Sequence, residues 1–385
     1  MAEWPNVVTR TLSQWLNSNP FIPKGIRCIV SDEGRVKIGT GVRFNDTPYL
    51  SQESILRKTH RNENARYFLP TISELHKACR YDPAKGGPGV PGYWNYGTQS
   101  DEIPGLATID EYGVGQMTDS DNTANWGGAS NWAKDPYSRS YSDVGTNGAP
   151  SHYGVYDVDG QAYTICEGFG GTLAPPEAGN DPTKNIGANG SIHTNPVAWD
   201  GQYSSHHMWN ANAMSFKFNT WGMRIASISN PDKLPNLVAV GDTGNPAQSK
   251  GVSSAYFEGY GSVDYEYQIS KFHVTHTEYA EFLNAIGATD EHDVYGEVFS
   301  GNGEGRGSGT LNGIRRLGSQ GNYYYEVMDH WANKPSGYLN FVTAARYCNW
   351  LHNGKPSGPQ IAATTEDGAY TLNGTLTTSV ARNSA

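Results

Sequence analysis

The chain has 385 residues, of which 17% are charged and 12% aromatic, so it is long enough to bury a full core and too aromatic for a disordered protein. Its formal net charge of −10 argues against nucleic acid as a partner, because neutralising phosphates requires clustered lysines and arginines. It contains no apolar run near the roughly 18 residues that a membrane span requires and no signal-peptide pattern at its start, which predicts no membrane insertion.

Residues 1–55 form a distinct N-terminal region, in which the pattern predicts a small β-rich module. The stretch "IRCIVSDEGRVKIGTG" (26–41) alternates apolar and polar residues on either side of a turn at 32–34, which is typical of a hairpin. A short helix is expected over 11–19. One hairpin and one short helix bury too little apolar surface to be stable alone, so we expect this module to pack against copies of itself.

The remainder of the chain has the pattern of three helices, over 71–81, 275–286 and 341–354. The first two open with threonine followed three residues later by glutamate, which is the capping-box pattern, and the third ends at a glycine. Apolar residues recur in each at helical spacing. Elsewhere the sequence predicts short strands and long loops rich in glycine, asparagine and proline, and therefore an α+β fold.

The four cysteines are far apart and show neither a CxxC motif nor the Cys/His spacing of a zinc site. We expect them to be buried free thiols rather than a disulfide framework. They are Cys28, Cys79, Cys166 and Cys348.

The N-terminal region contains a motif that is rich in glycine, asparagine and proline. Its positions are Asn19, Pro20, Gly25, Gly34, Lys37, Ile38, Gly39, Gly41, Asn45, Pro48 and Tyr49. This set resembles the small N-terminal domain of phage tail and receptor-binding proteins. The resemblance implies that residues 1–55 attach the chain to other phage tail proteins or oligomerise it, and we expect a homotrimer.

Longer motifs fill the rest of the chain. They include "ARYFLPTISELHKACRYDPAKGGPGVPGYW" (65–94) and "WGMRIAS" (221–227), then "VDYEYQISKFHVTHTEYAEFLNA" (263–285) and "NKPSGYLNFVTAARYCNWLHNGKPSGPQ" (333–360). The first two resemble the carboxy-terminal half of the formylglycine-generating-enzyme (sulfatase-modifying-factor) domain, and the last two resemble its amino-terminal half. The resemblance implies a variant of the C-type lectin fold, with short strands, three helices and long loops.

The two halves of the family occur in reverse order, which we interpret as a circular permutation of one domain over 56–385. The carboxy-terminal half would cover 60–228, a linker 229–241 and the amino-terminal half 242–385. Lectin-type folds have neighbouring termini, which a linker of about a dozen residues could join within one chain. The alternative is that two half-domains are completed by exchange between subunits.

The resemblance implies no enzymatic activity and no required cofactor. The family's oxidases use two cysteines, five residues apart, that bind copper(I), and soft sulfur ligands select that metal. The corresponding segment here, 197–221, contains no cysteine. The alternatives are a formylglycine-forming oxidase and a tail-associated hydrolase of polysaccharide.

Structural calcium is a further implication of the resemblance. One family site begins at an Asn-Trp pair that matches Asn125 and Trp126. A second runs through a Tyr-Asp motif, whose positions here include Asp157, Gly160 and Ala162. The carboxylate expected at position 164 is a threonine, which removes the strongest oxygen ligand of this second site.

The stretch "GQYSSHHMWNANAMSFKFNTWGMR" (201–224) is rich in aromatic residues, serine and asparagine, and it contains no carboxylate. Tyrosine and tryptophan supply rigid contact area, while serine, asparagine and histidine supply adaptable hydrogen bonds, a mixture typical of recognition loops. His206 and His207 would point to opposite faces of a strand, which disfavours a shared metal ion. A merely polar loop is the alternative.

The same stretch resembles the variable region of lectin-type proteins in diversity-generating retroelements, where codons before the last strand are rewritten. The resemblance implies a ligand-binding surface over 202–219, with two aromatic residues as the main anchors, Tyr203 and Trp209. The residues expected to contact the ligand are Tyr203, Ser204, Ser205, His206, His207, Trp209, Asn210, Asn212, Ser215, Phe216 and Asn219.

Together these features predict a phage tail receptor-binding protein, located at the tail tip or fibre of the virion. Its expected partners are a host cell-surface receptor, either protein or glycan, and other tail proteins. The alternative is a purely structural tail or baseplate component, whose aromatic segment contacts another virion protein.

Overall fold

The computed structural model describes five ranges of the chain in full, namely 61–126, 141–167, 221–249, 259–295 and 313–374. Further strands outside these ranges are described by their backbone alone. None of the helices in the described residues is long and apolar enough to span a membrane.

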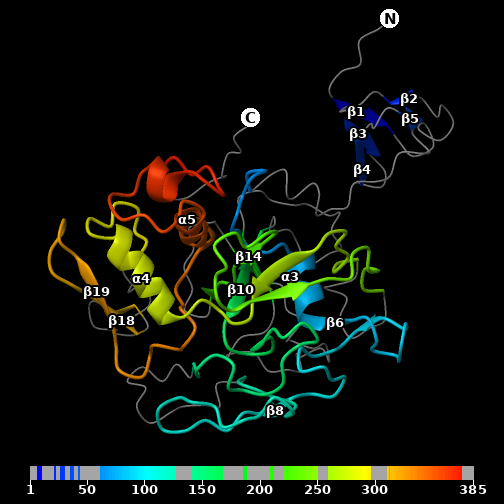
Figure 1. Cartoon of the computed structure of the whole chain (residues 1–385), viewed down its shortest axis with the longest axis horizontal. Helices are drawn as coiled ribbons and strands as arrows, with labels where there is room; N and C mark the ends of the chain where they lie inside the picture. Colours follow the sequence, from blue (N-terminus) through cyan, green and yellow to red (C-terminus); the bar gives the residue numbers. More distant parts are fainter. Residues whose placement is uncertain are drawn as a thin grey trace, which may run out of the picture.

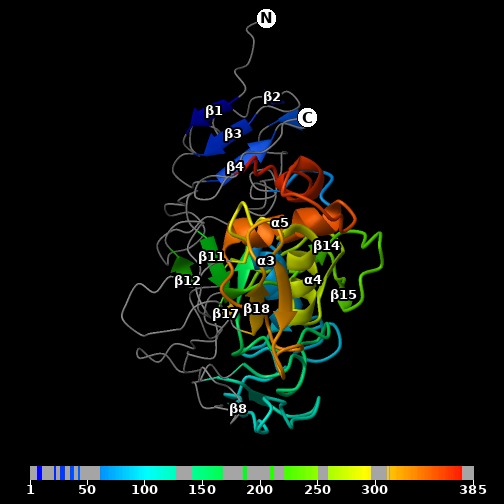
Figure 2. The ribbon, with the colours of Figure 1, turned by 90° about the vertical axis from the view of Figure 1, so that its left-hand side faces the viewer.

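The N-terminal region contains the short strands β1 (Val7–Arg10), β2 (Phe21–Ile22), β3 (Arg27–Val30), β4 (Arg35–Ile38) and β5 (Val42–Arg43). β3 and β4 pair in antiparallel register, which confirms the hairpin predicted over 26–41. β1 pairs with β3 in parallel, and β2 pairs with β5. The helix predicted over 11–19 lies outside the described residues. Figures 1 and 2 show these strands at one end of the molecule.

All three predicted helices are present, as α3 (Ile72–Arg80), α4 (His276–Ile286) and α5 (Phe341–His352). In α3 and α4 the capping threonine accepts a hydrogen bond from the amide of the glutamate three residues later, and that glutamate side chain accepts one from the threonine amide. Both predicted capping boxes therefore form. α5 is capped by Asn340, whose side chain accepts a hydrogen bond from the amide of Thr343 at 2.8 Å.

Short strands make up most of the remaining regular structure (Figure 1). The largest sheet has the order β12 (Trp209–Ala211), β11 (Asn185–Ala188), β10 (Tyr163–Cys166) and β13 (Trp221–Gly222). A second sheet has the order β14 (Ala226–Ser227), β16 (Tyr267–Ser270) and β15 (Leu237–Val240). A third has the order β17 (Thr310–Leu311), β18 (Ile314–Leu317) and β19 (Tyr324–Val327). The two-stranded pairs are β6 (Tyr81–Asp82) with β7 (Gly92–Tyr93) and β8 (Gly105–Leu106) with β9 (Thr123–Ala124). A π-helical turn at Ala362–Glu366 follows α5.

The stretch 229–241, expected to be a linker, contributes a strand to one of these sheets. Its β15 pairs with β16 in antiparallel register, from Leu237↔Ser270 to Val240↔Tyr267. Val240 is fully buried, whereas residues 231–233 are exposed. The first part of the stretch therefore connects over the surface, and its second part belongs to the folded body.

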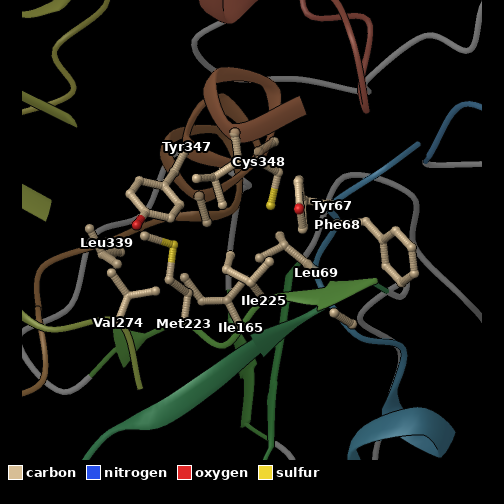
Figure 3. Close-up of a cluster of buried hydrophobic side chains, with 14 of the residues drawn as sticks. Tyr67, Phe68, Leu69, Ile165, Met223, Ile225, Val274, Leu339, Tyr347 and Cys348 are labelled. Atoms are coloured by element: carbon tan, nitrogen blue, oxygen red, sulfur yellow. The ribbon is translucent and has the colours of Figure 1, made fainter. Parts of the chain in front are cut away.

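One large hydrophobic core cluster contains residues of both 60–228 and 242–385, the two parts of the chain expected to be half-domains. Figure 3 shows part of this core, in which Ile165 and Met223 from the first part lie in one cluster with Val274, Leu339 and Cys348 from the second. All of these side chains are buried. Each part therefore depends on the other to remove its apolar surface from water.

Three of the four cysteines are buried thiols outside any disulfide, as predicted, and they are Cys79, Cys166 and Cys348. Burial raises the pKa of the Cys348 thiol well above its ordinary value, which keeps it protonated and unreactive. The side chain of the fourth, Cys28, lies outside the described residues.

Candidate binding site

The candidate recognition segment, residues 202–219, is attached to the four-stranded sheet at two places. β12 lies within the segment and pairs in antiparallel register with β11, at one edge of the described sheet. β13 follows the segment and pairs in parallel with β10, at the other edge. β12 and β13 therefore lie at opposite edges of one described sheet.

The strand that follows the segment is anchored in the protein interior. Trp221 is 1% exposed, and its carbonyl oxygen accepts a hydrogen bond from the amide of Leu339 at 3.3 Å. A Cβ atom on Gly222 would lie 3.1 Å from the carbonyl oxygen of Ser336, so a larger residue would push the two segments apart. The close approach of the chains at β13 thus favours glycine.

A buried chain of polar side chains lies behind β13. Nη2 of Arg224 donates to the carbonyl oxygen of Tyr156 at 2.5 Å and lies 3.2 Å from Nδ1 of His273. Nε2 of His273 lies 3.1 Å from Oγ1 of Thr164 in β10. Burial, together with the positive charge of Arg224, lowers the pKa of His273 well below its ordinary value. The ring is therefore neutral, with Nδ1 accepting from Arg224 and Nε2–H donating to Thr164.

Two of the predicted contact residues lie in described backbone. Trp209 is paired with Gly187, and Asn210 with Ile186, in the β11–β12 ladder. The other predicted contact residues lie outside the described residues, and they are Tyr203, Ser204, Ser205, His206, His207, Asn212, Ser215, Phe216 and Asn219.

The residues matched to the first calcium site are held in hydrogen bonds within the protein. Asn125 is 2% exposed, and its Nδ2 donates to Oγ of Ser142 at 3.1 Å. Its carbonyl oxygen accepts from the amide of Gln161 at 3.0 Å. The indole of Trp126 donates to the carbonyl oxygen of Pro104 at 3.1 Å. These bonds join the loops directly, and a calcium ion at Asn125 stays a prediction.

The carboxylate matched to the second calcium site already has protein donors. Oδ1 of Asp157 accepts from Nδ2 of Asn147 at 2.6 Å, and Oδ2 accepts from the amide of Gly145 at 2.7 Å. Burial raises the pKa of Asp157 above its ordinary value. Each carboxylate oxygen thus already accepts one N–H bond from the protein, and calcium at Asp157 stays a prediction.

The other two positions of that motif serve packing. Gly160 has a φ of +88°, and a Cβ atom there would lie 2.0 Å from the carbonyl oxygen of Asn125. Ala162 packs in a small apolar cluster with Tyr141 and Trp331. Within the described part of the chain, no group of three or more histidine, cysteine, aspartate or glutamate side chains is placed to hold a metal ion.

The sequence did not predict the buried polar chain behind β13. Arg224 is 49 positions from His273, which is 109 positions from Thr164, so no spacing pattern connects the three. The one usable signal is an arginine within the apolar stretch "WGMRIAS", because a buried charge requires polar partners.

A comparison of the chain with protein-family models, with curated proteins and with solved structures finds no match. The lectin-like and phage-tail assignments therefore rest on the motifs quoted above, and the function that they imply is a proposal.

Proposed function

We propose that this chain is a host-recognition protein of a bacteriophage tail, and that residues 202–219 bind a ligand on the host cell surface. The proposal takes residues 56–385 as a permuted lectin-like domain of formylglycine-generating-enzyme type. It takes residues 1–55 as the module that trimerises the chain and attaches it to other tail proteins of the virion.

The observation that carries the proposal is the contrast between the two edges of the largest sheet. β13 is fully buried, and the adjoining residues Met223 and Arg224 are also inaccessible, so the anchor is built from scaffold residues. β12, within the candidate segment, extends the same sheet at its edge. Side chains on an edge strand and its connections can change at lower cost than side chains of the core. This arrangement supports a segment that varies on a constant scaffold.

The composition of the segment supports a contact surface with weak affinity in each copy. Tyr203 and Trp209 are the expected anchors, because buried aromatic side chains contribute most to the free energy of many interfaces. Serine and asparagine around them can adapt their hydrogen bonds to different ligands. Three weak copies in a trimer would bind a multivalent host surface through avidity.

The proposal includes no catalytic step. The chain has no cysteine between Cys166 and Cys348, so the segment before β13 lacks the thiol pair of the family's oxidases. Without thiolates, the segment cannot form the copper(I)–dithiolate centre that those oxidases use.

The direct test uses phage particles that carry Trp209→Ala or Tyr203→Ala, with Ile361→Ala as a control at a half-exposed apolar residue elsewhere. Adsorption to host cells is expected to fall by about tenfold or more for the two aromatic variants, since loss of an anchor removes over about 1.4 kcal/mol. Their melting temperatures should match that of the wild type. Unfolding of these variants, or unchanged adsorption, would refute the assignment.

A further inference from the structure

The hairpin formed by β18 and β19 borders a pocket of about 370 Å³, within the size range of small-ligand sites. Four ionisable residues line it, namely Arg315, Glu326, Asp329 and His330. Val327 and Met328 supply its accessible apolar surface, and Trp331, which also lines it, is 1% exposed. Figure 1 shows the hairpin beside α4, and the residues of the pocket do not include any of the candidate recognition segment.

The side chains of Arg315, Glu326 and Asp329 make no polar contact with the rest of the described structure. Arg315 and Glu326 lie opposite each other in the β18–β19 register, and both are exposed. Among the fully described ranges, Arg315 is the arginine whose side chain makes no hydrogen bond or ion pair. The others all have polar partners, and they are Arg61, Arg66, Arg80, Arg224, Arg316 and Arg346. Within the same ranges, the carboxylates of Glu326 and Asp329 likewise accept no hydrogen bond.

One wall of the pocket is held in place by a buried lysine. The side chain of Lys334 is fully inaccessible, and its Nζ donates to the carbonyl oxygen of His330 at 2.5 Å and to that of Tyr112 at 3.0 Å. Nζ also lies 2.8 Å from Oδ1 of Asp143. The rings of Tyr112 and His330 are 4.7 Å apart. The rim is therefore fixed before any ligand arrives, which lowers the entropic cost of binding.

We propose that this pocket binds a neutral sugar residue, independently of the candidate recognition segment. A small anion would meet the carboxylates of Glu326 and Asp329, and a small cation would meet Arg315. A sugar hydroxyl both donates and accepts hydrogen bonds, so it can use the guanidinium and the carboxylates together. The apolar faces of the sugar ring suit Met328 and Val327.

The same face of the hairpin offers room for a second ring. Tyr324 is 49% exposed and lies opposite Leu317, two steps along the ladder from the Arg315–Glu326 pair. Alternate residues of a strand share a face, so Tyr324 and Glu326 lie on one side of the hairpin. An exposed tyrosine ring beside a polar pocket favours a chain of at least two sugars over a single one.

The test is a titration of the full chain with D-glucose, D-galactose, D-mannose and N-acetyl-D-glucosamine, followed by NMR. Arg315→Gln and Glu326→Gln are expected to weaken binding of the preferred neutral sugar by about tenfold, because each loses a charge-assisted hydrogen bond. Arg66→Gln and Asp232→Asn alter an exposed ion pair elsewhere and should bind as the wild type does. Unchanged melting temperatures would show that all four variants remain folded.

D-glucuronate and D-glucosamine serve as charged probes of the same size. A preference for either over all neutral sugars would overturn the proposed ligand class. A sugar site of ordinary affinity would be largely filled at a sugar concentration of about 50 mM. If no binding is seen at that concentration, the site is overturned. Equal binding by wild type, Arg315→Gln and Glu326→Gln would do the same. Trp209→Ala should keep its sugar binding, so failure of this inference and failure of the proposed host recognition can be told apart.

Discussion

Nδ2 of Asn62 donates a hydrogen bond to the carbonyl oxygen of Gly368 at 2.7 Å, although the two residues are 306 positions apart. The amide of Asn62 also donates to the carbonyl oxygen of Ala369, and the amide of Leu69 donates to Oη of Tyr370 at 2.9 Å. The two ends of the fully described part of the chain, near residues 62 and 370, therefore lie side by side. A circular permutation requires this arrangement, because the two ends of a permuted domain are consecutive in the unpermuted chain and must therefore lie close together.

A chain in which residues 233–385 precede residues 56–232 is therefore expected to fold. Its new ends, Asp232 and Lys233, lie in an exposed turn, where cutting the backbone removes few contacts. Thermal denaturation and near-ultraviolet circular dichroism would measure the outcome. We expect a cooperative transition within about 5 °C of that of the unaltered order, since a change of one kcal/mol shifts a domain of this size by only a few degrees.

A chain opened between Ala345 and Arg346 is the matched control. Both residues are buried in the middle of α5, so this cut interrupts a core helix and should prevent cooperative folding. If the 233-first chain also failed to fold, the interpretation as a permuted single-chain domain would be wrong.

The ion pair of Arg61 with Glu74 is expected to be essential for stability. Nη2 of Arg61 lies 2.9 Å from Oε1 of Glu74, and its Nε lies 3.6 Å from Oε2 of Glu167. Both glutamate side chains are inaccessible, and that of Arg61 is 6% exposed. Arg61→Ala would leave two buried carboxylates without their cation, which should lower the free energy of unfolding by about 3–5 kcal/mol. Urea denaturation measures this loss.

Arg66 provides the comparison, because it also pairs with a carboxylate but in solvent. Its partner is Asp232 at 2.5 Å, with the two side chains 35% and 43% exposed. Arg66→Ala is therefore expected to change the free energy of unfolding by less than about 1 kcal/mol. Equal losses for the two variants would mean that burial does not determine the contribution of these pairs.

The sequence predicted the helices well because their signals are local. A capping threonine and its glutamate are three residues apart, and apolar residues at helical spacing point to one side whatever lies beyond it. The polar contacts of the scaffold could not be predicted, because they depend on which distant segments meet. His273 lies between Arg224 and Thr164 only in the folded chain, and β15 was hidden in an expected linker because its pairing with β16 is not a local property.

Asp290 is expected to make stability depend on pH in the weakly acidic range. Burial raises the pKa of its carboxyl to about 6, although the amides of Val294 and Tyr295 and the guanidinium of Arg316, 3.1 Å away, act in the opposite direction. Protonation therefore favours the folded state, and this stability is lost as the pH rises through 6. Between a pH of about 4.5 and about 7, Asp290 alone should lower the free energy of unfolding by about 2 kcal/mol.

Asp290→Asn removes the titration while keeping an acceptor oxygen for the two amides. Urea denaturation at both pH values should show a smaller fall in the free energy of unfolding for this variant than for the wild type, by the same amount of about 2 kcal/mol. Asp232→Asn, at a carboxylate that is 43% exposed, should retain the wild-type fall. A wild-type pH dependence in Asp290→Asn would show that another group is responsible.

Truncation of two tryptophans twelve positions apart should lower the free energy of unfolding by very different amounts. Trp221 is 1% exposed, and it sits in β13 against β10, so Trp221→Ala would open a cavity and lower the free energy of unfolding by about 3–5 kcal/mol. Trp209 lies in β12 at the edge of the same sheet, and if its side chain serves recognition, Trp209→Ala should cost less than about 1 kcal/mol. Urea denaturation of both variants measures the contrast. Two large and equal losses would place Trp209 in the core, and the segment before β13 could then not vary freely on a constant scaffold.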